Sequence, residues 1–224
     1  MPSADRPTPP GRTQAEPSPE VAQAAKVTLR IAIQASRLVS EPQALTAARA
    51  ALALDLSSGH RTIALYSSSA AEPDTWGLID ALHERGHTLL LPLLGRRPDG
   101  TVRRGPDWGV YAGRDRLRVG YAGIAEPVTE ALGSEGLARA SVVWCPGLAA
   151  TVSGDRLGTG GGWYDRALAF ASPNALVGVL LRDAEVRAEL PVQPFDRRVD
   201  VIVTESRVIR TNGRGRNTSA DSGR

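Results

Sequence analysis

Apolar residues along the chain alternate between short strand-like runs and longer helical stretches. The strand-like runs are bounded by turn residues and fall at 62–66, 88–94, 141–145, 175–181 and 199–204. The helical stretches fall at 18–38, 43–54, 74–85 and 163–171. Alternation of this kind predicts an α/β fold with a mostly parallel sheet covered by helices on both faces. Active sites then gather at the carboxyl ends of strands, where the loops at 67–74 and 147–162 are expected.

The length and composition suit one folded domain. Of the 224 residues, 42% are apolar, which is enough to bury a sizeable core. We expect this domain at 18–209. The Pro-rich residues 1–17 and the Gly/Ser/Asn-rich residues 210–224 are expected to be disordered tails. The net charge of +3 comes from the arginines of the second tail, so the body shows no basic patch for nucleic acid.

The cysteine and histidine content and the hydropathy of the chain indicate its cellular compartment and its solubility. The single cysteine, Cys145, excludes an internal disulfide framework, and the three histidines show no zinc-ligand spacing. No apolar run approaches the roughly 20 residues that cross a bilayer, and the start of the chain lacks the apolar segment of a signal peptide. We therefore expect a soluble, cytoplasmic and monomeric protein that binds neither membrane nor nucleic acid.

The stretch 156–166 has the composition of a phosphate site. Four of the five residues at 158–162 are glycine, and Trp163 begins a predicted helix. Glycine allows positive φ and close approach of a ligand, and free N–H groups before a helix attract phosphate. Asp165 would repel a polyphosphate unless a cation lay between them, so the stretch predicts a nucleotide with Mg²⁺. The alternative is a tight connection in which Asp165 only complements the helix dipole.

Two familiar phosphate motifs do not fit this stretch. A dinucleotide fingerprint would need glycine where Trp163 stands, and a Walker A loop would need Gly-Lys-Ser/Thr, whereas Lys26 is the one lysine of the chain. The loop is therefore expected to bind phosphate in another way.

The first predicted helix carries a cationic face. Ser18, Pro19 and Glu20 form a helix start. Lys26, Arg30 and Arg37 follow at spacings of four and seven, which places them on one side of the helix. The face is either solvated, as in many amphipathic helices, or directed at phosphates.

The sequence Arg-Leu-Gly-x-Gly-x-Gly-aromatic-Tyr-Asp at 156–165 resembles the signature of the 5-formyltetrahydrofolate cyclo-ligase family, also called methenyltetrahydrofolate synthetases. Further segments resemble the same family, namely Lys-x-x-x-Arg at 26–30, Glu-x-x-Thr at 72–75, Gly-Ile-x-Glu-Pro at 123–127 and Pro-x-x-x-x-Asp-x-x-Val-Asp at 191–200. The chain departs from the family after Pro-Gly-Leu at 146–148, where Phe-Asp is replaced by Ala150 and Thr151.

The resemblance implies a fold and a reaction. The fold is a three-layer α/β sandwich like that of sugar-phosphate isomerases and CoA transferases. The reaction is the ATP- and Mg²⁺-dependent conversion of 5-formyltetrahydrofolate to 5,10-methenyltetrahydrofolate. The formyl oxygen would be phosphorylated by ATP, and N10 would then close the ring.

The resemblance also implies roles for individual residues. Arg156 and Tyr164 are expected to be catalytic, Glu72 and Trp163 to contact the folate, and Asp165 and Asp196 to hold Mg²⁺. The expected ATP contacts are Lys26, Arg30, Arg156, Gly158, Thr159, Gly160, Gly161, Gly162, Trp163 and Tyr164.

Several interpretations stay open at this level. Asp74 is expected to cap a helix, Asp196 could be a turn-forming acid, and residues 95–120 are expected to form a mobile flap or a substrate rim. A non-catalytic nucleotide or folate binder is an alternative function, suggested by the missing Phe-Asp at 150–151. A sugar-phosphate isomerase-like enzyme is another, although it would lack an acid-plus-histidine site.

Overall fold

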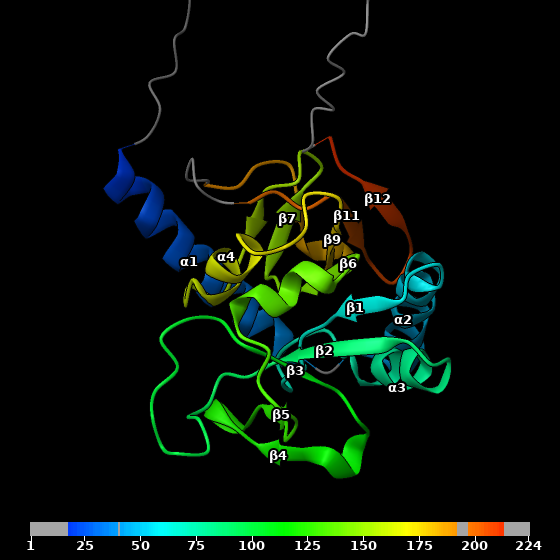
Figure 1. Cartoon of the computed structure of the whole chain (residues 1–224). Helices are drawn as coiled ribbons and strands as arrows, with labels where there is room; N and C mark the ends of the chain where they lie inside the picture. The colour runs from blue at the N-terminus through cyan, green and yellow to red at the C-terminus, as the bar shows by residue number, and fades with distance from the viewer. Residues whose placement is uncertain (1–17, 40, 192–196, 213–224) are drawn as a thin grey trace, which may run out of the picture.

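The computed structural model describes residues 18–39, 41–191 and 197–212, and its main element is a seven-stranded sheet (Figure 1). Five inner strands run parallel, and antiparallel strands form both edges. In sheet order the strands are β12 (Val208–Arg210), β11 (Val201–Val203), β9 (Leu176–Leu180), β6 (Val142–Cys145), β1 (Thr62–Ala64), β2 (Thr88–Pro92) and β3 (Trp108–Val110). The mostly parallel α/β sheet predicted from the sequence is confirmed.

Each face of this sheet has its own apolar core, because successive strand residues point to opposite faces. Ile63 and Leu89 belong to the core that contains residues of α2 and α3, whereas Ala64 and Leu90 belong to the core that contains residues of α4. In Figure 1, α2 and α3 lie together to the right of the central strands, and α1 and α4 lie to the left. The helices are α1 (Pro19–Arg37), α2 (Gln43–Ser57), α3 (Trp76–Glu84) and α4 (Trp163–Leu168). The likeness to sugar-phosphate isomerases and CoA transferases stays a prediction.

Helix α1 begins as the sequence predicts and packs beside a second, smaller sheet. The Oγ of Ser18 accepts a hydrogen bond from a first-turn N–H, and Ile33 contacts Leu157 in a separate apolar cluster. Lys26 and Arg37 share this face of the helix and are only 5% and 4% exposed, so the interpretation as a solvated face is wrong for them. The smaller sheet contains β10 (Val186–Arg187), β7 (Ala149–Thr151) and β8 (Arg156–Leu157).

The segment 95–120 is more ordered than the expected flap. Trp108 is completely buried in edge strand β3, and Tyr111 directly after it is also buried. Glu126 lies in the hairpin of β4 (Leu117–Val119) and β5 (Ala125–Pro127), where its buried carboxylate accepts a hydrogen bond from the Leu94 N–H at 2.7 Å. The flap interpretation is therefore wrong for the strand, and Glu126 connects the hairpin to the backbone that follows β2.

The predicted C-terminal boundary of the domain is also wrong. Arg210 is the last residue of β12, and the N–H groups of Thr211 and Asn212 bond to carbonyls of the body, so the boundary predicted at 209 is too early. The predicted tails 1–17 and 213–224 lie outside the described residues. Within the described part of the chain, none of the helices has the length and apolar character needed to cross a membrane.

Candidate active site

The glycine-rich turn leaves β8 and enters α4 through two left-handed residues. Gly160 and Gly162 have φ of 106° and 63°, values at which a side chain would be strained. Gly158 and Gly161 do not have positive φ. A Cβ at Gly158 would lie 3.0 Å from Nη1 of Arg156, whereas a Cβ at Gly161 would meet no atom within 4 Å. Only Gly160 and Gly162 are thus required by backbone conformation, and Gly161 borders open space.

Helix α1 brings its cations to this turn across about 130 residues of sequence. Nε of Arg30 donates to the carbonyl oxygen of Gly158 at 2.9 Å, a link over 128 residues. Lys26 and Arg30 line the same cleft as the glycines, Arg156 and Asp165, with a volume of about 200 Å³. Among the described residues that line this cleft, Lys26, Arg30 and Arg156 are cationic and Asp165 is acidic, a charge distribution that suits phosphate groups.

The helix dipole contributes less than the sequence suggests. Helix α4 ends at Leu168, three residues before the predicted end, and has six residues. Since the macrodipole sums over aligned peptide units, so short a helix adds little. The cationic side chains and the loop N–H groups are left as the main attraction for an anion.

Arg156 is held rigidly beside the turn. Its Nη1 donates to the Pro146 carbonyl oxygen at 2.9 Å, and its Nη2 donates to Oδ1 of Asp165 at 2.5 Å. The Arg156 side chain is 4% exposed and that of Asp165 is 42% exposed. The buried Nε of Arg156 has no hydrogen-bond partner within the described ranges. The guanidinium is thus fixed in place, while the carboxylate of Asp165 remains open to solvent.

Tyr164 borders a second, smaller cavity, and its hydroxyl oxygen is buried. The cavity measures about 60 Å³ and is bordered by Pro146, Thr159 and Trp163 besides the glycines, Arg156 and Asp165. The buried hydroxyl has no hydrogen-bond partner among the residues that the structure describes. Burial raises the pKa of Tyr164 well above its ordinary value, with the nearby Cys145 as the next cause, so the hydroxyl keeps its proton. A buried unpaired donor costs about 1–3 kcal/mol, which a ligand oxygen here would relieve.

Trp163 contacts both the apolar core and the smaller cavity. Its ring meets Trp108 edge-on at 5.2 Å between centroids, and it packs against the same apolar core as α4. Part of the residue borders the smaller cavity. A contact to either substrate is therefore possible only at that edge, and the larger part of the ring serves packing.

A third and larger cavity contains Glu72. It measures about 410 Å³ and lies between α1, the start of α2 and the loop before α3. Oε2 of Glu72 accepts from the N–H and the Oγ of Ser69, both at 2.9 Å, which closes the loop on itself. Asp74 accepts from the Trp76 N–H at 3.1 Å, which confirms its interpretation as a helix-capping acid. The charge of Glu72 also contributes to the raised pKa of Tyr164, after burial and Cys145.

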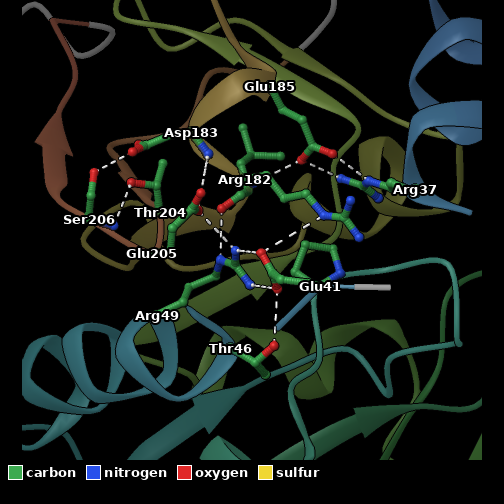
Figure 2. Close-up of polar contacts among 12 residues, drawn as sticks. Arg37, Glu41, Thr46, Arg49, Arg182, Asp183, Glu185, Thr204, Glu205 and Ser206 are labelled. Atoms are coloured by element: carbon green, nitrogen blue, oxygen red, sulfur yellow. Dashed lines mark hydrogen bonds and ion pairs between the residues drawn. The ribbon is translucent and has the colours of Figure 1, made fainter. Parts of the chain in front are cut away.

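A charged network borders this larger cavity (Figure 2). Arg49 donates to both carboxylate oxygens of Glu41 and to Glu205. Burial alone would raise the pKa of Glu41, but the hydrogen bonds and charge of Arg49 outweigh it and hold the pKa below its ordinary value. The network therefore keeps Glu41, which lies just before the start of α2, ionised.

The assignment of Asp165 and Asp196 to Mg²⁺ stays a prediction. Asp196 lies outside the described residues. Among the residues that are described, no group of three acidic, histidine or cysteine side chains could hold a metal ion. One open carboxylate, Asp165, beside a cationic cleft instead suits a Mg²⁺ that is bound mainly by nucleotide phosphates.

Sequence reasoning missed several residues that border the cavities. Gln23 lines the cationic cleft, and its spacing of three before Lys26 could have revealed it. Glu41 and Arg182 line the larger cavity, but they lie far apart in the sequence and no local pattern connects them.

Comparisons with known proteins show which family this chain resembles. The model of the 5-formyltetrahydrofolate cyclo-ligase family matches residues 22–205. The chain is 34% identical over 149 residues to a 5-formyltetrahydrofolate cyclo-ligase of Mycolicibacterium smegmatis, covering 66% of this chain and 76% of that protein. It is 30% identical over 148 residues to the Escherichia coli K12 enzyme of the same name, covering 66% and 79%.

Solved structures show the same relationship. The NMR structure of Aquifex aeolicus 5,10-methenyltetrahydrofolate synthetase superposes with a TM-score of 0.71 and 27% identity, covering 88% of this chain and 97% of that one. The Mycoplasma pneumoniae 5,10-methenyltetrahydrofolate synthetase, at 16% identity and a TM-score of 0.60 over 80% and 98% of the two chains, shares the fold. The chain therefore belongs to the 5-formyltetrahydrofolate cyclo-ligase family of enzymes.

Proposed function

We propose that the chain converts 5-formyltetrahydrofolate to 5,10-methenyltetrahydrofolate with consumption of Mg-ATP and release of ADP and phosphate. The observation that carries the proposal is the meeting of Lys26 and Arg30 of α1 with the turn 158–162 in one cationic cleft. A cleft of this kind, with an exposed carboxylate at its edge, has the parts that phosphoryl transfer requires.

The reaction needs activation more than a protein nucleophile. The formyl group on N5 is an amide and a poor electrophile, so transfer of the γ-phosphoryl group to its oxygen creates a leaving group. N10 attacks the same carbon and loses its proton, and inorganic phosphate departs. Because N10 is tethered near the carbon, ring closure is intramolecular and depends on positioning.

The nucleotide side of the site has three parts. Lys26, Arg30 and the N–H groups of the turn would hold the phosphates. Arg156, anchored by Pro146 and Asp165, would neutralise charge on the transferring group. Mg²⁺ would neutralise further phosphate charge, and Asp165 is the described carboxylate placed to bind it.

The folate side would be the larger cavity with Glu72, together with Tyr164 of the smaller cavity. The Tyr164 hydroxyl is protonated and has no hydrogen-bond partner within the described ranges, so it can donate to a substrate oxygen near Arg156. This supports Tyr164 as a catalytic donor and Trp163 as a packing residue with one edge at the substrate.

The missing Phe-Asp pair does not favour the non-catalytic alternative. Ala150 is buried in β7, and Thr151 bonds to Ser153 and Asp155 next to β8. Neither Ala150 nor Thr151 is among the residues that border the three cavities. The proposal also includes that the protein is a cytoplasmic monomer and that it binds neither membrane nor nucleic acid.

The decisive experiment is a turnover assay with the purified chain. The methenyl chromophore should appear when 5-formyltetrahydrofolate and Mg-ATP are both present, and it should be absent when either ATP or Mg²⁺ is omitted. Arg156→Lys keeps the charge but loses the planar fork, so it should bind nucleotide and lose most of the rate. Arg198→Lys is the matched control, because Arg198 pairs with Asp155 outside the clefts. A folded protein that forms no chromophore would refute the proposal.

A further inference from the structure

Arg37, the third cation on the face of α1, does not border the cationic cleft that contains Lys26 and Arg30. Its guanidinium forms a two-point ion pair with Glu185, with Nε to Oε1 and Nη2 to Oε2 both at 2.7 Å (Figure 2). Both residues are buried. The charge of Arg37 is thus balanced by Glu185 inside the protein.

Two further N–H groups of Arg37 bond to backbone carbonyls. Nη2 donates to the Gly147 oxygen at 2.8 Å and Nη1 donates to the Ala71 oxygen at 3.3 Å. Ala71 precedes Glu72 in the loop of the larger cavity. Gly147 lies in the turn that follows β6. One side chain therefore joins α1 to two loops that belong to different parts of the site.

The turn after β6 is held from both sides. Arg156 donates to the Pro146 carbonyl oxygen from the nucleotide side, and Arg37 donates to the next carbonyl, that of Gly147. Pro146 borders the smaller cavity with Tyr164, whereas Arg37 and Ala71 border the larger one. Residues 146 and 147 are consequently shared between the two halves of the proposed site.

The chemistry of the ion pair points to positioning more than to stability. Desolvation of two charges offsets much of their attraction, so a buried pair is weak support for stability by itself. The planar fork of arginine can hold several acceptors at defined angles, which a lysine or an apolar residue cannot do. Arg37 uses this property to connect Glu185, Gly147 and Ala71.

We propose that Arg37, oriented by Glu185, is a positioning residue that keeps the Glu72 loop and the 146–147 turn in register with α1. It thereby couples folate binding to nucleotide binding and aligns the formyl oxygen with the transferring phosphoryl group. The inference rests on the function proposed above and assigns a role to a residue outside the cationic cleft.

The test variant is Arg37→Lys, which leaves a positive charge beside Glu185 but cannot reach all acceptors. The affinities for Mg-ATP and for 5-formyltetrahydrofolate, each measured alone by calorimetry, should change little. The kcat should fall about a hundredfold, as expected for misaligned reactants. In the wild type, a non-hydrolysable ATP analogue should tighten folate binding by about 5-fold or more, and this enhancement should disappear in the variant.

Two further proteins make the result interpretable. Arg103→Lys is the control, because Arg103 also forms a buried ion pair, with Asp107, and contacts neither loop. It should lower Tm without changing kcat. If Arg37→Lys does not fold, the double variant Arg37→Gln/Glu185→Gln removes both charges together, and its amide at 37 is too short to replace the fork.

The outcomes separate this inference from the proposed function. A wild-type protein without ATP-dependent turnover would overturn both. Wild-type turnover with unchanged kcat and coupling in Arg37→Lys would overturn the positioning role alone. Loss of ATP binding in that variant would make Arg37 a nucleotide ligand instead, and a Tm loss like that of Arg103→Lys with intact kcat would make it purely structural.

Discussion

Gly161→Ala is a substitution that separates ligand contact from protein stability. Gly161 borders the smaller cavity with Arg156 and Tyr164 and has no positive φ, and a Cβ at this residue would have no atom within 4 Å. The new methyl group would therefore stand in free space that a phosphate would otherwise approach. Gly160→Ala is the contrasting variant, because Gly160 has a φ of 106° that an alanine adopts only with strain.

The two substitutions should change the melting temperature in opposite directions. Gly→Ala at a compatible backbone position stabilises by about 0.4–1 kcal/mol through the unfolded state, which for a chain of this size raises Tm by about 1–4 °C. Strain at Gly160 should cost about 1–3 kcal/mol and lower Tm by about 2–12 °C. Loss of one charge-assisted hydrogen bond from the loop costs about 1.5–3 kcal/mol, so Gly161→Ala should weaken Mg-ATP binding about ten- to hundredfold.

Thermal melts and calorimetry with Mg-ATP would check these values. Gly77→Ala is the matched control, since Gly77 lies in α3 with nothing within 4 Å and no positive φ. It should gain stability and keep its ATP affinity. If Gly161→Ala melts slightly higher and binds Mg-ATP normally, the turn does not cradle phosphate and the assignment of the cleft is wrong.

Three further results are expected. Asp165→Asn should raise the Mg²⁺ concentration for half-maximal rate by at least about tenfold while Tm changes little, because the amide oxygen still accepts from Arg156; an unchanged Mg²⁺ titration would contradict the ligand role. Lys26→Ala and Arg30→Ala should each raise KM for ATP about ten- to hundredfold and KM for the folate much less; equal effects would indicate a packing helix. The lowered pKa of Glu41 means that its stabilisation is complete above the unfolded value of 4.5 and is lost as pH falls through the folded value, so the Tm difference between wild type and Glu41→Gln should shrink from about pH 7 to about pH 3.

Local pattern was sufficient for most of the fold. The inner strands and the first helix appear where periodicity and end signals place them, since a buried parallel strand needs a continuous apolar run and Ser18-Pro19-Glu20 satisfies a helix start. Strand β3 was missed because it is three residues long and sits in an Arg/Gly-rich segment. Trp108 of this strand lies in the core that also contains residues of α4, and its ring packs edge-on against Trp163; no local pattern contains these contacts.

By itself the sequence determined the α/β class, the family resemblance, the glycine-rich turn and the cationic face of α1, because each depends on residues close together in the chain. Only the tertiary structure decided which cation serves which purpose. Arg30 and Arg37 lie seven residues apart on one helix face, yet one bonds to Gly158 of the turn and the other is neutralised by Glu185. The charge balance and the burial of each guanidinium depend on a partner that is distant in the sequence. The spacing of residues along a helix does not predict that partner.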